Sequence, residues 1–285
     1  MSYAGAPTSV RSLEQRLRNL EGDDGLAQRR RVSMALVVVG QMLSAGAIKG
    51  GSAMALRFGR STRFTRDLDA ARIGSLAGFR AEFEEELARG WAGFTGRLVE
   101  KAAPTPEAVP TAYVMKPFEV KLDYRGRAWC TVKFELGHNE IGDAEESELH
   151  LADDLAVMFT EVGLETPVPV RVMRADHQIA QKLHALSAQG SEPARDLVDL
   201  QLLESRENLN AGQIEETCVR LFEYRRQQPW PPIVTVAEHW HPLYAEAADG
   251  VDVLHSVDEA VVWVNDFIRR IASAGSATTA EGDRR

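Results

Sequence analysis

The sequence predicts an α/β protein in which helices flank a mixed sheet. Three patterns indicate this fold class. Apolar residues recur at helical spacing near both ends of the chain, as they do between residues 9 and 20. Residues 118–136 alternate apolar and polar side chains around a short turn, which predicts a β-hairpin. Between these segments, a small apolar stretch at 45–48 ends in two glycines and good helix formers follow, so we expect a tight turn and a helix that begins at Ser52.

The N-terminal part of the chain is predicted to be helical. A first helix starts at Ser9, and a second helix covers about 26–43. Three consecutive arginines, Arg29 to Arg31, lie near the start of the second helix, where positive charge opposes the helix dipole. These arginines therefore either bind a partner or a substrate backbone, or form a solvated charged face.

The remaining elements follow from the same periodicities. Asp67 and Asp69 lie in a predicted strand that ends at Gly74. We then expect a helix over 76–88, a strand over 94–99, a loop over 101–111, the hairpin, a loop or short helix over 140–154, and an edge strand over 167–172. The last elements are a helix capped by Asp176, a helix from about residue 194, helices over 214–228 and 256–274, and a frayed tail over 275–285. Trp240 and Tyr244 are expected to pack in the core of this part.

The composition is that of an ordinary globular protein. The net charge is −9, but residues 1–72 contain twelve basic and six acidic residues, so this segment carries +6 and the rest carries −15. The asymmetry indicates either a basic functional face on an acidic body or a solvated charge pattern. The longest apolar run is too short to cross a bilayer and the N-terminus has no signal-peptide pattern, so we expect a cytoplasmic protein without membrane contact. Cys130 and Cys218 are expected to be unpaired thiols.

The glycine turn has the chemistry of a phosphate site. Gly50 and Gly51 let a ligand approach the backbone closely. The free N–H groups and partial positive charge at the start of the following helix favour a phosphate. Ser52 can cap this helix or donate its hydroxyl to a phosphate oxygen.

Two carboxylates follow the turn. Asp67 and Asp69 flank Leu68, so in a strand both carboxylates point to one face while Leu68 points into the core. Two adjacent carboxylates repel unless a cation lies between them, and Mg²⁺ takes oxygen ligands and bridges to phosphates. A phosphate site followed by such a pair is the arrangement that nucleotidyl transfer needs.

These residues also carry a family resemblance. Lys49-Gly50-Gly51-Ser52-Ala53, followed by Asp67-Leu68-Asp69, resembles the motif of the DNA polymerase β-like nucleotidyltransferases. The fuller strings, at 49–56 and 63–69, are similar to those of AbiEii-type (MenT-like) nucleotidyltransferase toxins of bacterial toxin–antitoxin systems, with serine where that family usually has threonine. The segments 180–186 and 195–200 resemble the lysine motif and the Arg-Asp-x-x-Asp motif of the same family.

The resemblance implies a polymerase β-like core with a mixed sheet, N-terminal helices and a C-terminal helical subdomain. We expect an N-terminal helical segment at 1–46, the nucleotidyltransferase core at 47–174, the helical subdomain at 175–277 and a disordered tail at 278–285. The implied reaction transfers a nucleoside monophosphate from an NTP to an acceptor hydroxyl, with tRNA 3′ ends as the leading acceptor. Such an activity would block translation, and a cognate antitoxin would neutralise it.

The resemblance also assigns roles to individual residues. Asp67 and Asp69 would hold Mg²⁺ or Mn²⁺, and Glu135 on a later strand would be a third carboxylate. The nucleotide-binding candidates are Lys49, Gly50, Gly51, Ser52, Arg66 and Lys182, and the catalytic candidates are Asp67, Asp69, Lys182, Asp196, Asp199 and Glu135.

Four alternatives stay open at this point. Lys182 can form an ion pair with Asp196 or Asp199 across adjacent helices instead of binding phosphate. Glu135 can be a solvent-facing strand residue, since alternation alone does not tell which face is buried. The enzyme can instead transfer the terminal phosphoryl group of an NTP to a protein such as its antitoxin. The chain can also be a nucleotide-binding interaction protein without catalysis.

Overall fold

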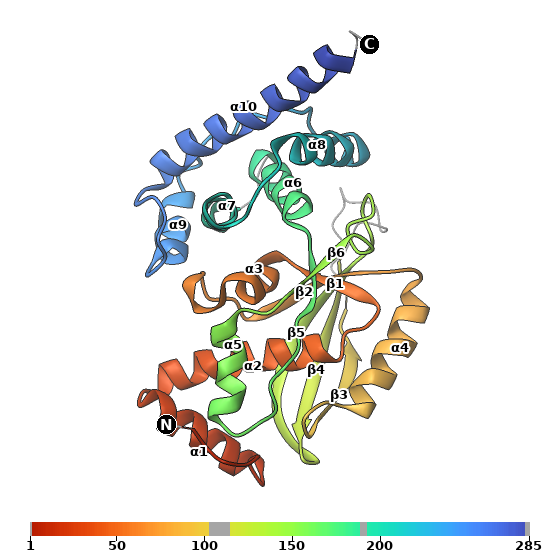
Figure 1. Ribbon diagram of the computed structural model, residues 1–285, viewed down its shortest axis with the longest axis vertical. Coiled ribbons are helices and arrows are strands. Elements are labelled where there is room, and N and C mark those ends of the chain that lie inside the picture. The colour runs from red at the N-terminus through yellow and green to blue at the C-terminus, as the bar shows by residue number, and fades with distance from the viewer. Residues whose placement is uncertain (1, 103–114, 189–192, 283–285) are drawn as a thin grey trace. The chain divides into compact units, whose positions relative to one another are not determined.

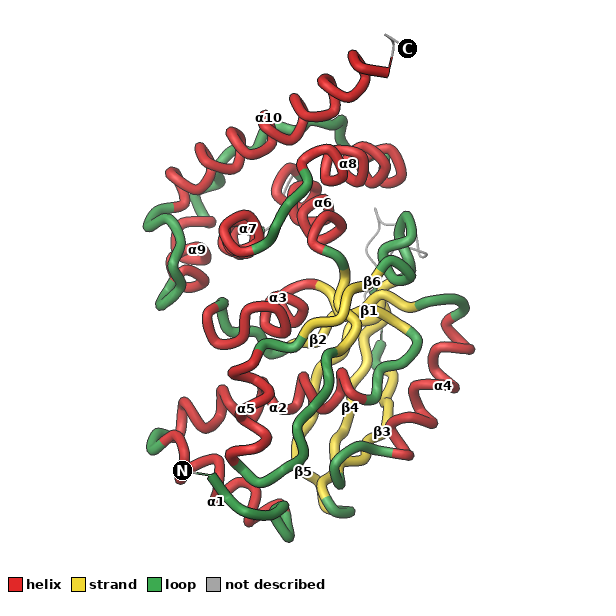
Figure 2. The backbone as a smooth tube through the Cα atoms, viewed as in Figure 1, coloured by secondary structure: helices red, strands yellow, loops and turns green. Residues whose placement is uncertain are grey.

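The computed structural model describes residues 2–102, 115–188 and 193–282, which form two compact units. The first unit consists of residues 1–60 and 64–173, and the second consists of residues 61–63 and 174–285. The first unit contains the sheet and the second unit is helical (Figures 1 and 2). In the part of the chain that is described, no helix combines the length and apolar character needed to span a membrane.

A seven-stranded mixed sheet forms the centre of the first unit, so the predicted α/β fold class is confirmed. The strands lie in the order β3 (Phe94–Glu100), β4 (Lys116–Tyr124), β5 (Arg127–Gly137), β2 (Asp67–Arg72), β1 (Gly46–Lys49), β7 (Val170–Met173) and β6 (Ser147–His150). Strand β2 runs parallel to β5 and antiparallel to β1, and β1 runs parallel to β7. The β4–β5 hairpin is the one that the alternating pattern predicts.

Helices cover one face of this sheet. They are α1 (Val10–Glu21), α2 (Asp24–Gln41), α4 (Leu76–Arg89) and α5 (Asp153–Glu161), while α3 (Gly50–Phe58) follows β1 directly. The side chains of Ser9, Asp23 and Ser75 cap α1, α2 and α4, and serine and aspartate are favoured residues at this position. The core joins Leu68 of β2 and Phe134 of β5 to aromatic side chains of α4. The opposite face of β2 therefore carries Asp67 and Asp69.

The second unit contains five helices within the described residues. They are α6 (Ala175–Ser187), α7 (Ala194–Arg206), α8 (Ala211–Arg225), α9 (Trp240–Ala248) and α10 (Val257–Gly282). Helix α6 packs against α7 and α8, and α10 lies along α8 (Figure 1). Trp240 and Tyr244 are buried in α9, which confirms their predicted core role. Cys130 and Cys218 are free thiols, and burial raises the pKa of Cys130 to about 12.

Four sequence-based expectations about these elements were wrong. Residues 140–154 contain a complete strand, β6, and the start of α5 instead of only a loop or short helix. Strand β7 is not an edge strand, because β6 pairs with it on the outside and its prolines precede the paired residues. Asp176 does not cap α6; it lies in the first turn and accepts hydrogen bonds from Arg174. Helix α10 extends to Gly282, beyond the end that was expected for it at residue 274.

Two expectations fall partly outside the described residues. The loop expected over 101–111 lies mostly outside them, since residues 103–114 are not described. The same holds for residues 283–285 at the end of the predicted tail.

Candidate functional site

The glycine turn joins β1 to α3. Helix α3 begins at Gly50, two residues before the predicted start at Ser52, and Lys49 is its N-cap residue. The helix begins early because Gly50 has a φ of +61°, which glycine adopts readily. This conformation turns the chain sharply from strand to helix. The N–H groups of Gly50, Gly51 and Ser52 thus occupy the first turn of the helix, where they have no acceptor within it. This is the backbone arrangement that binds phosphates.

The hydroxyl of Ser52 forms hydrogen bonds to the protein backbone. Its side chain is fully buried, donates to the Lys49 carbonyl at 2.9 Å and accepts from the Asp69 N–H at 3.2 Å. The hydroxyl thereby joins the turn to β2 next to Asp69. A phosphate contact by this hydroxyl stays a prediction, and the contacts that the structure shows give Ser52 a positioning role.

Strand register brings the predicted carboxylates together. Asp69 lies directly opposite Glu135 of β5 on one side and Lys49 of β1 on the other. Residues paired across a sheet point to the same face, so these side chains form one row. Asp67 pairs with Lys133, whose Nζ lies 4.0 Å from Asp67 Oδ1. The structure therefore places Glu135 beside the aspartate pair, and it adds Lys133, which alternation in the sequence did not single out.

The donor chemistry of this row fits Mg²⁺ or Mn²⁺. Magnesium is usually held by one or two carboxylates, with the remaining ligands supplied by substrate phosphates and water. Asp67 and Asp69 supply two such carboxylates on alternate residues of one strand. In the described chain, no three His, Cys, Asp or Glu side chains form a metal cluster.

Gly50 and Asp69 are in direct contact. A Cβ added at Gly50 would overlap the Asp69 carboxylate, so the close approach of turn and carboxylate depends on glycine. Gly74 also has a positive φ, +73°, but a Cβ there meets nothing within 4 Å.

We expect Gly50→Ala to lower transfer activity at least tenfold and to destabilise the fold by about 1–2 kcal/mol or more, because alanine adds left-handed strain and displaces Asp69. Gly74→Ala carries the backbone strain alone and serves as the matched control. Thermal unfolding and initial transfer rates of both variants test this expectation. Equal activity in the two variants would show that the turn does not position Asp69.

The C-terminal end of α3 is fixed by a buried arginine. Arg57 donates to Glu148 Oε2 of β6 and to the Met173 carbonyl of β7, each at 2.7 Å. A hydrogen bond from His150, together with Arg57, lowers the pKa of Glu148 to about 2 although its partial burial acts in the opposite direction. The strand β6, which the sequence pattern missed, is thus an anchor for the helix that carries the glycine turn.

The second motif forms a buried charge cluster in the helical unit. Lys182 of α6 donates to Asp196 Oδ1 at 2.7 Å and to Asp199 Oδ2 at 2.6 Å, both on α7. Arg63 donates twice to Asp199, at 2.9 and 2.8 Å. Lys182 is only 5% exposed and Asp199 is not exposed at all. The ion pair that was left open for Lys182 is therefore present, and two cations balance two carboxylates.

The pKa values in this cluster follow from burial and charge together. Burial alone lowers the pKa of Lys182, but Asp196 and Asp199 outweigh it and hold that pKa above its ordinary value. Burial alone raises the pKa of Asp199, but Lys182 and Arg63 outweigh it and lower that pKa below its ordinary value. Lys182 and Asp199 are thus both charged at neutral pH. The sequence analysis did not assign Arg63 to this cluster. The sequence feature that could have indicated its role is its position in the 63–69 motif.

Arg66 lies on the surface just before β2. Its guanidinium carbon is 5.5 Å from the centre of the Phe64 ring, and the side chain is exposed. A nucleotide contact by Arg66 stays a prediction.

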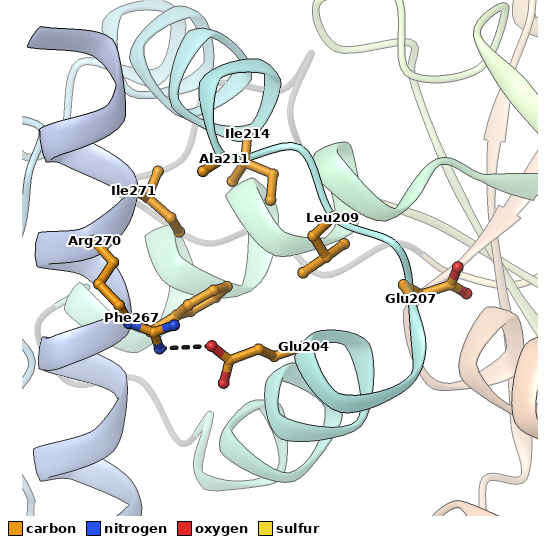
Figure 3. Close-up of a pocket in the computed structure, with 8 residues that line it drawn as sticks. All are labelled: Glu204, Glu207, Leu209, Ala211, Ile214, Phe267, Arg270 and Ile271. Atoms are coloured by element: carbon orange, nitrogen blue, oxygen red, sulfur yellow. Dashed lines mark ion pairs between the residues drawn. The ribbon is translucent and has the colours of Figure 1, made fainter. Parts of the chain in front are cut away.

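A hollow of about 290 Å³ lies in the helical unit, and none of the predicted site residues lines it (Figure 3). Its wall is mainly apolar, with Ile214, Phe267 and Ile271, and the Arg270–Glu204 ion pair of 2.6 Å borders it. Glu207 adds a second carboxylate to the wall of the hollow (Figure 3).

A mixed sheet with a glycine turn, two aspartates on one strand and a third carboxylate on the neighbouring strand defines the class of nucleotidyltransferases. The family model described as "Nucleotidyl transferase AbiEii toxin, Type IV TA system" matches residues 42–262. The chain belongs to this family of nucleotidyltransferase toxins, as the motifs at 49–69 and 180–200 predicted.

A solved structure with this fold is similar to the chain. MenT4, a nucleotidyltransferase toxin from Mycobacterium tuberculosis, matches with a TM-score of 0.54 and 17% sequence identity, over 93% of this chain and 89% of that chain. A protein from H. pylori described as a candidate nucleotidyltransferase matches with a TM-score of 0.45 and 15% identity, over 90% and 98% of the two chains. A comparison with curated proteins gave no significant match. At these identities the likeness concerns the fold.

Proposed function

We propose that the protein transfers a nucleoside monophosphate from an NTP to the 3′ hydroxyl of tRNA. The observation that supports this most directly is the register of β2, which places Asp69 between Lys49 and Glu135 beside the glycine turn. An acceptor that loses its free 3′ end in this way no longer supports translation, so the reaction would make the chain toxic. We further propose that it acts in the cytoplasm, where tRNA is found, and that a cognate antitoxin binds it.

The residues have separate tasks in this proposal. Asp67 and Asp69 hold the metal, and Mg²⁺ or Mn²⁺ when bound neutralises the charge that develops on the phosphates. The N–H groups of Gly50 and Gly51, with Lys49, bind phosphate oxygens. The acceptor oxygen forms a bond to the α-phosphorus, the bond to pyrophosphate breaks, and the acceptor proton passes to Glu135. Glu135 is a better acceptor for this proton than Asp199, because Asp199 is fully buried and forms ion pairs with two cations.

Lys182 has two tasks in the proposal. Two of its three N–H donors bind Asp196 and Asp199. In this proposal the third donor binds a phosphate oxygen of the NTP. The aspartates would then hold the ammonium in position for that contact. Asp196 and Asp199 are thus positioning residues, although each was first a catalytic candidate.

Product analysis tests the reaction. The protein is incubated with total tRNA, Mg²⁺ and each NTP in turn, labelled at either the α- or the γ-phosphate. We expect label from the α-phosphate in RNA, no label from the γ-phosphate, and no transfer after EDTA treatment. Label from the γ-phosphate in a protein would instead establish phosphotransfer, and retained nucleotide binding without any labelled product would indicate a non-catalytic protein.

A further inference from the structure

The three consecutive arginines of α2 have three different environments. Arg30 is buried, donates to the Met158 carbonyl at 3.1 Å and forms ion pairs with Glu21 and Glu161. Arg31 is half-buried and lies 3.7 Å from a Glu14 carboxylate oxygen. Neither the partner-binding nor the solvated interpretation fits Arg30, which is structural. Arg29 differs, because it is exposed and faces an aromatic ring.

Arg29, Phe64 and Arg66 form a surface stack. The guanidinium carbon of Arg29 lies 5.2 Å from the centre of the Phe64 ring, and that of Arg66 lies 5.5 Å from it. Phe64 is half-buried while both arginines are exposed. Among the described residues, neither arginine has a carboxylate within ion-pair distance, in contrast to Arg30 and Arg31. Within the described residues, the stack thus carries two positive charges that have no ion-pair partner.

This combination suits single-stranded RNA. Guanidinium groups donate to phosphate oxygens, and their flat faces stack on bases, as aromatic rings do. Single-stranded nucleic acids are bound by such basic and aromatic surfaces, with stacking that tolerates any base. The segment of the chain that contains the stack has the matching sign, since residues 1–72 carry +6 in a chain whose net charge is −9.

The position of the stack in the chain links it to the carboxylates. Arg66 directly precedes Asp67, the first residue of β2, and Phe64 lies three residues before it. An RNA end bound here would therefore lie next to the strand that carries the predicted metal ligands.

We propose that the Arg29–Phe64–Arg66 stack binds the single-stranded 3′ end of the acceptor RNA. This inference rests on the proposed transfer to RNA, because it assigns that acceptor a surface. Phe64 holds the two guanidinium groups flat, a base stacks on the outer face of one of them, and their N–H groups bind the flanking phosphates. The nucleotide phosphates lie instead at the glycine turn.

Three variants of the full chain test the stack. Arg29→Ala with Arg66→Ala removes both charges, Phe64→Leu removes the ring at constant charge, and Arg11→Ala with Arg127→Ala removes two exposed arginines elsewhere in the same unit. Binding of a labelled single-stranded oligoribonucleotide is measured by fluorescence anisotropy over a range of salt concentrations. Melting temperatures with and without Mg²⁺–NTP show whether each variant is folded and binds nucleotide.

We expect the Arg29/Arg66 variant and Phe64→Leu to bind RNA on the order of tenfold more weakly, as loss of one stacked base would cause. The arginine variant alone should lower the salt slope, by roughly 0.7 for each phosphate that it no longer binds. The Arg11/Arg127 variant should bind RNA almost as well as the natural chain, and all variants should keep their Mg²⁺–NTP melting shift.

Other results would overturn the proposal. Unchanged RNA binding would leave the stack as a candidate surface for a protein partner. An equal loss in the Arg11/Arg127 variant would show that only bulk charge matters, and a lost Mg²⁺–NTP shift with intact RNA binding would assign the stack to the nucleotide. If the natural chain binds RNA through the stack but transfers no nucleotide to it, the proposed function is refuted and the RNA-binding role of the stack is retained. If the stack variants label RNA as well as the natural chain does, the RNA-binding role of the stack is refuted and the proposed function is retained.

Discussion

Asp67→Asn and Asp69→Asn are each expected to lower nucleotidyl transfer on the order of a thousandfold or more while the chain stays folded. Asparagine keeps the shape of the side chain but lacks the charge that holds a divalent metal against the phosphates. Stability should be unchanged or slightly higher, because the substitution relieves repulsion between neighbouring carboxylates. Asp67 in particular is half-exposed, so its loss of charge costs little in the absence of metal.

Glu119→Gln is the matched control for these two variants. Glu119 of β4 pairs with Lys133 of β5, and Lys133 pairs with Asp67 of β2, so the control removes a carboxylate from the same face of the same sheet. Transfer rates, melting temperatures and the Mg²⁺ dependence of activity are measured for all three variants. Full activity in either aspartate variant, or activity that resists EDTA, would exclude the two-carboxylate metal site.

Local patterns in the sequence predicted the elements that have a clear period. The alternation over 118–136 and the helical spacing over 76–88 reappear as the β4–β5 hairpin and α4, since each repeats one side-chain direction over many residues. Strand β6 has only four residues, too few for a period to show. The start of α3 was misplaced because serine is a good capping residue, whereas the positive φ of Gly50 starts the helix earlier.

The pairing of distant segments could not be predicted in this way. Alternation shows that Glu135 shares a face with Lys133, but not that β5 lies beside β2 or that Asp69 is its partner. Arg63 and Asp199 are 136 positions apart, and no local pattern connects them. For Lys182 the motif was recognised from the sequence, but its contacts were not. The sequence left an ion pair and a phosphate contact as alternatives.

Lys182→Met is expected to lower the melting temperature on the order of 10 °C in the absence of ligand. Removing one partner of a buried ion pair typically costs about 3–5 kcal/mol, and here it leaves three charges that sum to −1. Methionine keeps much of the apolar stem and the helix propensity of lysine, so loss of the cation dominates the effect. The mutation alone therefore cannot separate a structural role from a phosphate contact.

A second substitution makes that separation possible. Asp196→Asn in the Lys182→Met background removes the carboxylate whose described partner is Lys182 and leaves Arg63 with Asp199 as a neutral, doubly hydrogen-bonded pair. We expect the double variant to regain most of the lost melting temperature. Asp196→Asn alone serves as the control for the loss of that carboxylate.

The response to nucleotide then decides the role of Lys182. A ligand that binds only the folded state raises the melting temperature, so the natural chain and the Asp196→Asn control should both gain a shift with Mg²⁺–NTP. If the third donor of Lys182 binds a phosphate oxygen, the double variant melts almost normally but loses most of this shift, and its transfer rate falls on the order of a hundredfold. A double variant with the full nucleotide shift would restrict Lys182 to its ion pair, because a restored fold would then bind the NTP without the ammonium.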